Sequence, residues 1–305
     1  MKTVLVTGSE GFVGTHLIKA LRETPYEVVP VSYPLLMPEK GNYVPLDILN
    51  QEMSRDVVKS YGPDIIFHLA AISSVSKSLR DPQLTYQTNI IGTVNLLEAA
   101  KSLNKKIRFI FVSTCELYGG GDGLTEASEI ILKNPYAISK YAAELICRNY
   151  LMEDIGCVIL RPFNHTGPGQ AEDFVLPTIA KQIAEIEKSS RPPLIEIGNK
   201  EIKREFINIS DMIEAYVRAL EKCQPGEIYN ISSNIGYTLS EVLDIFKELS
   251  RARFEIKIDP SKMRKVDIPV LTGDGRKFSS LTGWQPKFKL AKTLEDLLNY
   301  WRAKI

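Results

Sequence analysis

The sequence predicts an α/β protein in which helices cover both faces of a parallel sheet, a doubly wound arrangement with a smaller, interleaved α/β lobe. Three observations predict this fold. Short apolar segments alternate with segments of helical spacing through the first half of the chain, a pattern typical of parallel strands buried on both faces. The first apolar segment ends in a glycine-rich turn before a helix. After residue 162 the chain becomes rich in turn residues, which indicates a second lobe.

The elements follow in a regular order. The segment MKTVLVTG (1–8) is the first expected strand, and the spacing of apolar residues from Phe12 to Leu21 predicts the first helix. The further buried strands are expected at 27–32, 42–48, 64–71, 107–114 and 157–163, and the further helices near 50–60, 81–103 and 135–153. This alternation predicts a dinucleotide-binding domain of the Rossmann type.

The second half is expected to return to the first sheet. Segments 204–209 (REFINI) and 227–232 (EIYNIS) have the composition of strands and flank a helical segment at 211–220. We therefore predict a dinucleotide-binding domain made of 1–162 plus about 206–232. The substrate domain would comprise about 163–205 plus 233–305. A chain of 305 residues is long enough to bury a substantial core in such a unit.

Charge and composition limit the possible partners. The chain has 38 basic and 37 acidic side chains, a net charge of +1, so neither a nucleic acid nor a membrane surface is predicted as a partner. The four cysteines are scattered, and we find no signal peptide and no apolar run near the ~20 residues of a membrane span. We expect a reduced, cytoplasmic protein. The three histidines are far apart, so no metal site is predicted, although ligands separated in sequence stay possible.

The turn TGSEGFVG (7–14) is the first functional signal. Gly8, Gly11 and Gly14 lie where strand passes into helix, and glycines there let the backbone approach a pyrophosphate at the helix N-terminus. Phe12 and Val13 are expected to contribute to the same cofactor site. A simple tight turn is the alternative, but its place in the first strand-turn-helix unit favours dinucleotide binding.

The choice between the two nicotinamide cofactors depends on the end of the second strand. NAD-specific proteins usually place a carboxylate there, on the ribose 2′-hydroxyl. Here the strand ends near Ser32, and no carboxylate follows before Glu39. No arginine marks a 2′-phosphate either, so NADP(H) is only slightly favoured over NAD(H). Asp47, at the end of the third expected strand, is predicted to meet the adenine, with a helix cap as the alternative.

The segment NPYAISK (134–140) carries the chemical signal. Tyr136 and Lys140 are four residues apart, so both side chains lie on one face of a helix. An ammonium near a phenol lowers the phenol's pKa, which would make the tyrosine a proton donor and acceptor. The pair can also arise by chance. Thr114, at the end of a predicted strand in FVSTCELYG, could bind a substrate oxygen beside the tyrosine, or could simply cap the strand end.

Five segments together resemble the extended short-chain dehydrogenase/reductase family. They are the glycine turn, FHLAA, NIIGTVNLLEAA, STCELYG and PYAISK, in this order along nearly the whole chain. The resemblance implies Thr114, Tyr136 and Lys140 as the catalytic trio and Asn89 as the residue that supports the lysine. Asn89 could instead satisfy a neighbouring backbone group. Further cofactor contacts implied by the resemblance are Ile48, Leu69, Ala70 and Ala71.

Segments in the second lobe resemble one branch of that family. RPFNHTGPGQ (161–170), GNKEIKREF (198–206) and MRKVDIPVLTGD (263–274) are similar to the GDP-4-keto-6-deoxy-mannose reductases, with the GDP-mannose 4,6-dehydratases as relatives. Two arginines could bind a diphosphate through charge-assisted forks, or each could form only a surface ion pair. The residues that the resemblance places against the GDP-linked sugar are Asn164, Val175, Arg204, Arg264 and Asp267.

The expected reaction is reduction of a C4 ketone on a nucleotide-linked hexose, and three alternatives stay open. A 4,6-dehydratase fits less well because its asparagine motif typically continues with an ESPRRGE-like stretch, whereas this chain has TGPGQAEDF. Glu116 stands where dehydratases keep a base, and related reductases can keep it too. A 4-epimerase and a non-catalytic dinucleotide sensor are the other two. A homodimer is predicted because helices 89–100 and 136–151 have apolar positions enough to pack against a second copy, or against their own sheet only.

Overall fold

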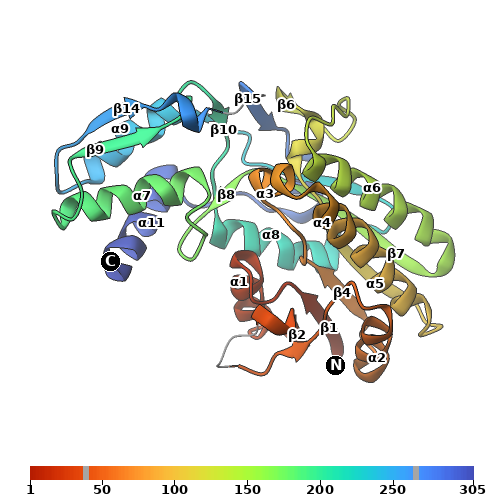
Figure 1. Ribbon diagram of the computed structural model, residues 1–305. Helices are drawn as coiled ribbons and strands as arrows, with labels where there is room; N and C mark the ends of the chain where they lie inside the picture. The colour runs from red at the N-terminus through yellow and green to blue at the C-terminus, as the bar shows by residue number, and fades with distance from the viewer. Residues whose placement is uncertain (37–40, 264–267) are drawn as a thin grey trace.

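The computed structural model describes residues 1–36, 41–263 and 268–305 (Figure 1). Its main feature is a seven-stranded sheet whose neighbouring strands are all parallel. In order across the sheet the strands are β12 (Ile228–Ile231), β7 (Ile155–Pro162), β5 (Ile107–Val112), β4 (Ile65–His68), β1 (Lys2–Thr7), β2 (Tyr26–Ser32) and β3 (Val44–Pro45). The chain builds outward from β1 to β3 and then returns to β4 on the other side of β1. The predicted doubly wound parallel sheet is confirmed.

Helices cover both faces of this sheet, as Figure 1 shows. Those nearest to it are α1 (Phe12–Leu21), α2 (Gln51–Tyr61), α5 (Gly92–Lys101), α6 (Pro135–Asn149), α8 (Ile209–Lys222) and α10 (Arg276–Thr282). Shorter pieces lie before or beside them, namely α3 (Val75–Arg80), α4 (Pro82–Tyr86), the π-helical turn η2 (Gln87–Ile91), and the 3₁₀ turns η1 (Pro34–Leu36), η3 (Cys115–Tyr118) and η4 (Tyr150–Glu153).

The burial pattern of β1 explains why its sequence is continuously apolar. Val4, Leu5 and Val6 are all fully buried, and Leu5 belongs to a different hydrophobic cluster from its two neighbours. Successive side chains of a strand point to opposite faces of the sheet. Since both faces are covered, every residue of a central strand needs an apolar side chain.

The second lobe has its own core. Its helices are α7 (Val175–Glu187), α9 (Leu239–Leu249) and α11 (Leu290–Lys304), and they pack around strand β9 (Leu194–Ile197), which pairs with β14 (Glu255–Ile258) beside the turn η5 (Pro260–Lys262). A four-stranded sheet joins β13 (Tyr237–Thr238), β10 (Lys203–Arg204), β15 (Val270–Gly273) and β6 (Gly121–Leu124). This sheet connects the lobes, because β6 comes from the first half of the chain. The predicted domain boundaries themselves stay a prediction.

Two sequence predictions about strands differ from the structure. Segment 227–232 contains β12 and joins the large sheet beside β7, as predicted. Segment 204–209 does not: its strand β11 (Ile207–Asn208) pairs with β8 (His165–Thr166) in a separate two-stranded sheet. The edge of the large sheet beside β7 is occupied by β12, which leaves no place there for β11. The third strand, expected over 42–48, is only Val44–Pro45, because the backbone beyond it turns toward α2.

A buried ion pair fixes helix α6 on the sheet. Arg161, in β7, donates to both carboxylate oxygens of Glu144, in α6, at 2.9 and 2.6 Å, and both side chains are almost fully buried. The Arg161 guanidinium also donates to the Tyr118 hydroxyl at 3.0 Å. That hydroxyl donates in turn to Asn230, in β12, at 2.7 Å. The two strands at this edge and α6 are therefore joined by charge-assisted hydrogen bonds that water does not screen.

Candidate active site

The glycine turn lies at the carboxyl end of β1, where the winding direction of the sheet reverses. Gly8 has a φ of +67°, and a Cβ there would lie 2.8 Å from the backbone nitrogen of Ala70. A Cβ on Gly14 would lie 2.1 Å from the carbonyl oxygen of Gly8. Both positions therefore need glycine, one for its conformation and both for close packing. This edge is where doubly wound sheets bind ligands.

The N-terminus of α1 opens toward the same edge. Gly11 is its N-cap and provides no side-chain hydrogen bond, and the first turn contains no acidic residue. The first amides of a helix have no intrahelical acceptor, so those of Phe12 and Val13 can donate to an anion, helped by the partial positive charge of the helix end. The residues present fit the phosphates of a dinucleotide.

The remaining predicted cofactor residues lie at neighbouring strand ends. Ser32 ends β2 and is fully buried. Asp47 lies beyond β3, and its carboxylate accepts from the backbone nitrogen of Leu49 at 2.9 Å. Asn50, not Asp47, caps α2, so the helix-cap alternative for Asp47 is wrong and its adenine contact stays a prediction. The other predicted contacts are Ile48, which is buried after β3, and Leu69, Ala70 and Ala71, which follow β4.

The predicted trio is buried together at the carboxyl edge. Thr114 immediately precedes η3, and Tyr136 and Lys140 lie one turn apart on the buried face of α6. Each of the three side chains is less than a tenth exposed. The Thr114 side chain is close enough to the Tyr136 hydroxyl to act on its pKa, and the Thr114 hydroxyl accepts from the backbone nitrogen of Glu116 at 3.2 Å. The fold therefore brings together the threonine and tyrosine that the sequence only suggested.

Burial governs the protonation of the tyrosine and the lysine. It raises the pKa of Tyr136 well above its ordinary value, and the Thr114 side chain offsets only part of this. The predicted lowering of that pKa is wrong for this structure, because burial is the largest influence on it and acts in the opposite direction, as do Cys115 and Glu116. Burial also lowers the pKa of Lys140 to about 8, with Cys147 and Glu144 opposing the shift. A neutral phenol thus stands near an ammonium that holds its proton weakly.

The Lys140 ammonium lies against an aromatic ring. Its Nζ lies 4.5 Å from the centre of the Phe111 ring. Among the residues that the structure describes, none accepts a hydrogen bond from this ammonium or forms an ion pair with it. A buried cation without such partners is costly, so its presence here points to a ligand that would bind it.

Asn89 lies in the π-helical turn and satisfies backbone groups, which was one of its two predicted roles. Its side chain accepts from the nitrogen of Ile72 at 2.8 Å and donates to the carbonyl of the same residue at 3.0 Å. It also donates to the Ser139 hydroxyl at 2.9 Å, and Ser139 donates to the carbonyl of Tyr136 at 2.8 Å. Asn89 is therefore linked to the backbone of the tyrosine, while support of Lys140 through a water stays a prediction.

Glu116 is held in place rather than solvated. It is nearly buried in η3, and the Asn134 side chain donates to its carboxylate at 3.4 Å. Asn134 is also the N-cap of α6, where it accepts from the nitrogen of Ala137 at 2.8 Å. The catalytic role of Glu116 stays a prediction.

The predicted substrate residues lie in the second lobe. The buried Oδ1 of Asn164 has no partner among the described residues. Val175 is the first residue of α7 and is 40% exposed. Arg204 is 6% exposed and donates to the carbonyls of Lys203 at 2.9 Å and Ile268 at 2.6 Å. The surface-pair alternative for Arg204 is therefore wrong. The predicted Arg264 and Asp267 lie outside the described residues.

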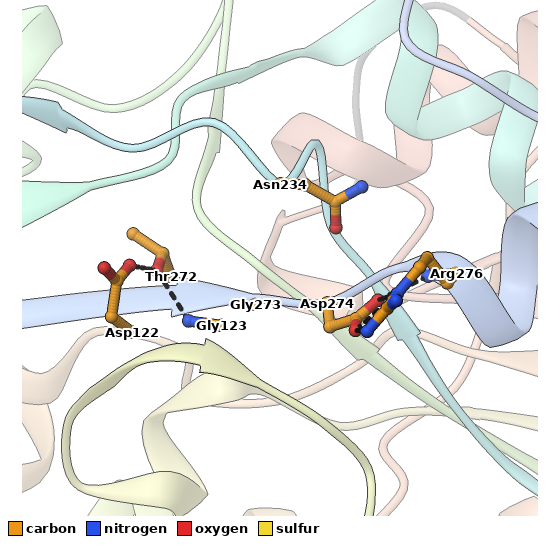
Figure 2. A pocket seen from close by; sticks show the side chains of 7 residues that line it. All are labelled: Asp122, Gly123, Asn234, Thr272, Gly273, Asp274 and Arg276. Atoms are coloured by element: carbon orange, nitrogen blue, oxygen red, sulfur yellow. Dashed lines mark hydrogen bonds and ion pairs between the residues drawn. The ribbon is translucent and has the colours of Figure 1, made fainter.

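An open hollow of about 410 Å³ lies on the connecting sheet, and no member of the trio lines it (Figure 2). In Figure 2, Asp122 and Thr272 lie on one side of it and the Asp274–Arg276 ion pair on the other. Lys203 pairs with Asp122 across 3.6 Å. Since successive strand residues point to opposite faces, the neighbouring Arg204 projects from the other face of β10. The hollow is not part of the predicted substrate site.

Two buried serines near the trio were not predicted from the sequence. Ser78 accepts from the backbone nitrogen of Tyr136 at 3.2 Å, and Ser139 binds the carbonyl of the same residue. Both serines are fully buried. Ser139 immediately precedes Lys140 in the motif, which was a usable signal, whereas nothing local marked Ser78. A polar side chain that acts from another helix has no sequence pattern of its own.

Other features of the described residues limit the chemistry. No helix among them is long and apolar enough to cross a membrane. In the same ranges no group of three His, Cys, Asp or Glu side chains is arranged to hold a metal ion. All four cysteines are buried and free.

Comparisons with known proteins agree with this geometry. The family model described as GDP-mannose 4,6 dehydratase matches residues 5–297. GDP-6-deoxy-D-mannose reductase of Pseudomonas aeruginosa is 32% identical over 99% of this chain and 98% of that protein. The solved structure of RMD from Pseudomonas aeruginosa complexed with NADPH is similar with a TM-score of 0.89 and 30% identity, over 100% of both chains. UDP-glucose 4-epimerase from Thermus thermophilus with NAD has a TM-score of 0.88 and 26% identity, over 99% of this chain and 100% of that one.

The buried ammonium predicts that Lys140→Met stabilises the protein near neutral pH. Lys140 has a pKa of about 8 in the folded chain, against a reference value of 10.5. Between these values the unfolded state binds more protons, so this group makes stability rise with pH. At pH 7 the folded chain bears the full penalty, on the order of a few kcal/mol. We therefore expect the variant to have a higher free energy of unfolding at pH 7, and the difference to shrink between pH 8 and 10.5.

Chemical denaturation of the parent and both variants at several pH values measures this effect. The matched control is Lys133→Met, because Lys133 is exposed just before the same helix. Lys133→Met should not give a stabilisation that decreases between pH 8 and 10.5. A Lys140→Met protein that is less stable than the parent at pH 7 would contradict the desolvated state of Lys140.

Proposed function

The chain belongs to the family of the GDP-mannose 4,6-dehydratase model, within the extended short-chain dehydrogenases/reductases, and on this premise we propose that it is a reductase. The proposed reaction is NAD(P)H-dependent reduction of the C4 ketone of a GDP-4-keto-6-deoxy-hexose, such as GDP-4-keto-6-deoxy-D-mannose to GDP-D-rhamnose. The observation that carries this proposal is the burial of Thr114, Tyr136 and Lys140 together at the edge of the sheet that also holds the glycine turn.

The proton chemistry belongs to the side chains. The reduced nicotinamide, when bound, supplies the hydride to the carbonyl carbon. Tyr136 gives its proton to the ketone oxygen, and Thr114 holds that oxygen by a hydrogen bond. The phenolate left on Tyr136 is stabilised by the Lys140 ammonium on the same helix face. Lys140 is also proposed to bind the ribose of the cofactor, which would give the ammonium the acceptors that the protein lacks.

The sequence after Asn164 favours reduction over dehydration, because it reads TGPGQAEDF where the dehydratases typically have an ESPRRGE-like stretch. The likeness to a GDP-6-deoxy-D-mannose reductase over 99% of this chain supports the same choice. A non-catalytic sensor would leave the buried trio unexplained. The position of Glu116 is compatible with a dehydratase, and for this reason the assay below includes GDP-mannose.

The cofactor is proposed to be NADP(H), with NAD(H) as an alternative. Ser32 ends β2, and the described residues that follow, Tyr33 to Leu36, include no carboxylate to repel a 2′-phosphate. The likeness to a reductase structure complexed with NADPH supports this choice. Glu39 lies outside the described residues.

The GDP-linked sugar is proposed to lie against Asn164, Val175 and Arg204. The unsatisfied Oδ1 of Asn164 supports a polar ligand at this place. Arg204 supports an anionic one, since its guanidinium is a buried cation. Arg264 and Asp267 stay predicted contacts.

A homodimer is proposed from the apolar outer face of the helices that carry the site. Ile138 and Leu145 of α6 are 40% and 48% exposed, and Ile91 of η2 is 50% exposed. The two elements that carry these side chains, α6 and η2, pack against each other. Packing against a second copy would bury them.

Sedimentation should give twice the mass of one chain, and Leu145→Asp should shift the protein toward the monomer. A parent protein that sediments as a monomer would contradict the proposal.

A cytoplasmic location is also proposed, because all four cysteine thiols are unpaired as expected in a reducing compartment. Recovery of the protein from a secreted or periplasmic fraction would contradict it.

The reaction itself is the first prediction of this proposal. GDP-4-keto-6-deoxy-mannose with NADPH should be turned over with consumption of NADPH, at least as efficiently as with NADH. GDP-mannose without added reductant should give no keto-sugar. Absorbance of the nicotinamide and analysis of the sugar nucleotides measure both results. Formation of the keto-sugar from GDP-mannose would replace the reductase by a dehydratase.

Two variants connect the turnover to the site. Tyr136→Phe should lower kcat by about 10²-fold or more, because it removes the proton donor. The control is Tyr150→Phe, which removes a hydroxyl bonded to Glu98 at the other end of α6. Normal turnover in a folded Tyr136→Phe protein would remove this residue from the mechanism.

A further prediction concerns the diphosphate. Loss of a charge-assisted contact costs about 1.5–3 kcal/mol, so Arg204→Ala should raise the KM for the GDP-sugar roughly ten- to a hundredfold. Inhibition by GDP should weaken in parallel, and affinity for the nicotinamide cofactor should change little. Arg204→Lys should restore only part of the loss, because it keeps the charge without the planar fork.

The neighbouring residue provides a matched control. Lys203→Ala removes a cation from the opposite face of β10, where Lys203 pairs with Asp122, and should leave the KM unchanged. If Arg204→Ala binds GDP as well as the parent does, the diphosphate is held elsewhere.

A further inference from the structure

A buried hydrogen-bond chain begins beside the glycine turn. The backbone nitrogen of Ala70 donates to the Thr7 hydroxyl at 3.2 Å, and this hydroxyl lies 2.8 Å from Nδ1 of His68. On the other side of the ring, Nε2 of His68 lies 3.0 Å from the Thr93 hydroxyl. Thr7, His68 and Thr93 are each at most 1% exposed. This hydrogen-bond chain therefore crosses from the ends of β1 and β4 to helix α5 without contact with water.

The direction of each hydrogen bond follows from the available protons. Thr93 donates its only hydroxyl proton to the carbonyl of Asn89 at 2.8 Å, so it must accept from Nε2 of His68. Burial lowers the pKa of His68 to about 3, so the ring is neutral and carries its single proton on Nε2. Nδ1 is then an acceptor and receives the Thr7 proton. Each of these groups therefore has a defined role as a hydrogen-bond donor or acceptor.

The hydrogen-bond chain continues into helix α6, which carries Tyr136. The backbone of η2 has π spacing, since the nitrogen of Gly92 bonds to the carbonyl of Gln87, five residues earlier. Such turns redirect side chains and are frequent at functional sites. From this turn Asn89 donates to Ser139, and Ser139 donates to the carbonyl of Tyr136. Thr7, beside Gly8, is thus connected to the backbone of Tyr136 through buried side chains and, at Asn89, through both the backbone carbonyl and the side-chain amide of that residue.

We propose that His68 and Thr93 are positioning residues of the reaction. Their hydrogen bonds hold the π-helical turn in place. Through Asn89 and Ser139, that turn sets the position of Tyr136 relative to the glycine turn. The inference rests on the proposed function, because it assigns these residues a part in the same proton transfer. Neither side chain belongs to the predicted catalytic or binding set, and neither contacts Tyr136 in any described hydrogen bond.

The rival explanation is that these hydrogen bonds only satisfy buried polar groups. In that case the loss of one of them would lower the stability of the protein but would leave the geometry of Tyr136, and therefore kcat, unchanged. If the chain positions Tyr136, a break should slow the chemical step in protein that remains folded, because small displacements of a reacting group reduce rates strongly. Substrate and cofactor binding should change little.

Thr93→Val is the test, because it removes the hydroxyl and keeps the shape of the side chain. We expect a fall in kcat of about tenfold or more, a KM within about twofold of the parent, and a larger isotope effect with deuterated nicotinamide, since the chemical step becomes slower. Thr93→Ser keeps the hydroxyl and should recover most of the rate. The signal of ¹³Cζ-labelled Tyr136, assigned by its loss in Tyr136→Phe, should shift in Thr93→Val.

Thr85→Val is the matched control. The Thr85 side chain is also fully buried and also donates to the carbonyl four residues earlier, that of Asp81, at 2.8 Å, but it is not part of the chain. It should lose comparable stability without loss of kcat or a shift of the Tyr136 signal. Equal kcat and unshifted signals in Thr93→Val and Thr85→Val would overturn the positioning role.

Two further outcomes are separated by design. If the parent does not reduce the GDP-keto-sugar, the proposed function fails, while the Tyr136 signal still decides the positioning role. If Thr93→Val does not fold, Ser139→Ala breaks the same chain at its last step without added volume and should show the same fall in kcat. A folded Ser139→Ala with parental kcat and an unshifted Tyr136 signal would overturn the inference.

Discussion

The two-point ion pair between Arg161 and Glu144 is the constraint on which the site depends. Glu144 lies on the same face of α6 as Tyr136 and Lys140, two turns beyond Tyr136 and one turn beyond Lys140. Because both charges are almost fully buried, neither can leave its partner without a large desolvation cost. The helix therefore has one stable depth and one rotation on the sheet. That single placement sets where the phenol and the ammonium stand relative to the end of β5 and to the glycine turn.

The same low-polarity surroundings explain the protonation states in the site. Tyr136 is kept neutral, Lys140 holds its proton weakly, and His68 is neutral in one tautomer, all for the reason that burial disfavours charge. A neutral donor is the form that reduction of a ketone needs. The buried ammonium is unfavourable to the folded chain by itself, and it becomes favourable only when a ligand provides acceptors. Function and stability are therefore opposed at Lys140.

The second lobe uses a buried carboxylate as its organising group. Glu205 is fully buried and accepts from the nitrogens of Ser233 and Gly273 and from the hydroxyls of Ser232 and Ser233, each within 2.8 Å. Burial raises its pKa, while these donors oppose the shift. The carboxylate joins the end of β12 to β15, and it directly follows Arg204. The orientation of that arginine toward the proposed diphosphate site is thus tied to the edge of the large sheet.

The sequence by itself determined the fold class, the glycine turn and the candidate trio, because these depend on local spacing. Apolar runs such as that of β1 require a sheet covered on both faces, and residues four apart must share a helix face. Only the tertiary structure decided that β11 pairs with β8, that Asp47 does not cap α2 and that burial, not the lysine, controls the pKa of Tyr136. These outcomes depend on contacts between segments far apart in sequence. The chain from Thr7 through His68 to Ser139 is of this kind, since each of its members looks ordinary in its own segment and gains a role only from neighbours that the fold supplies.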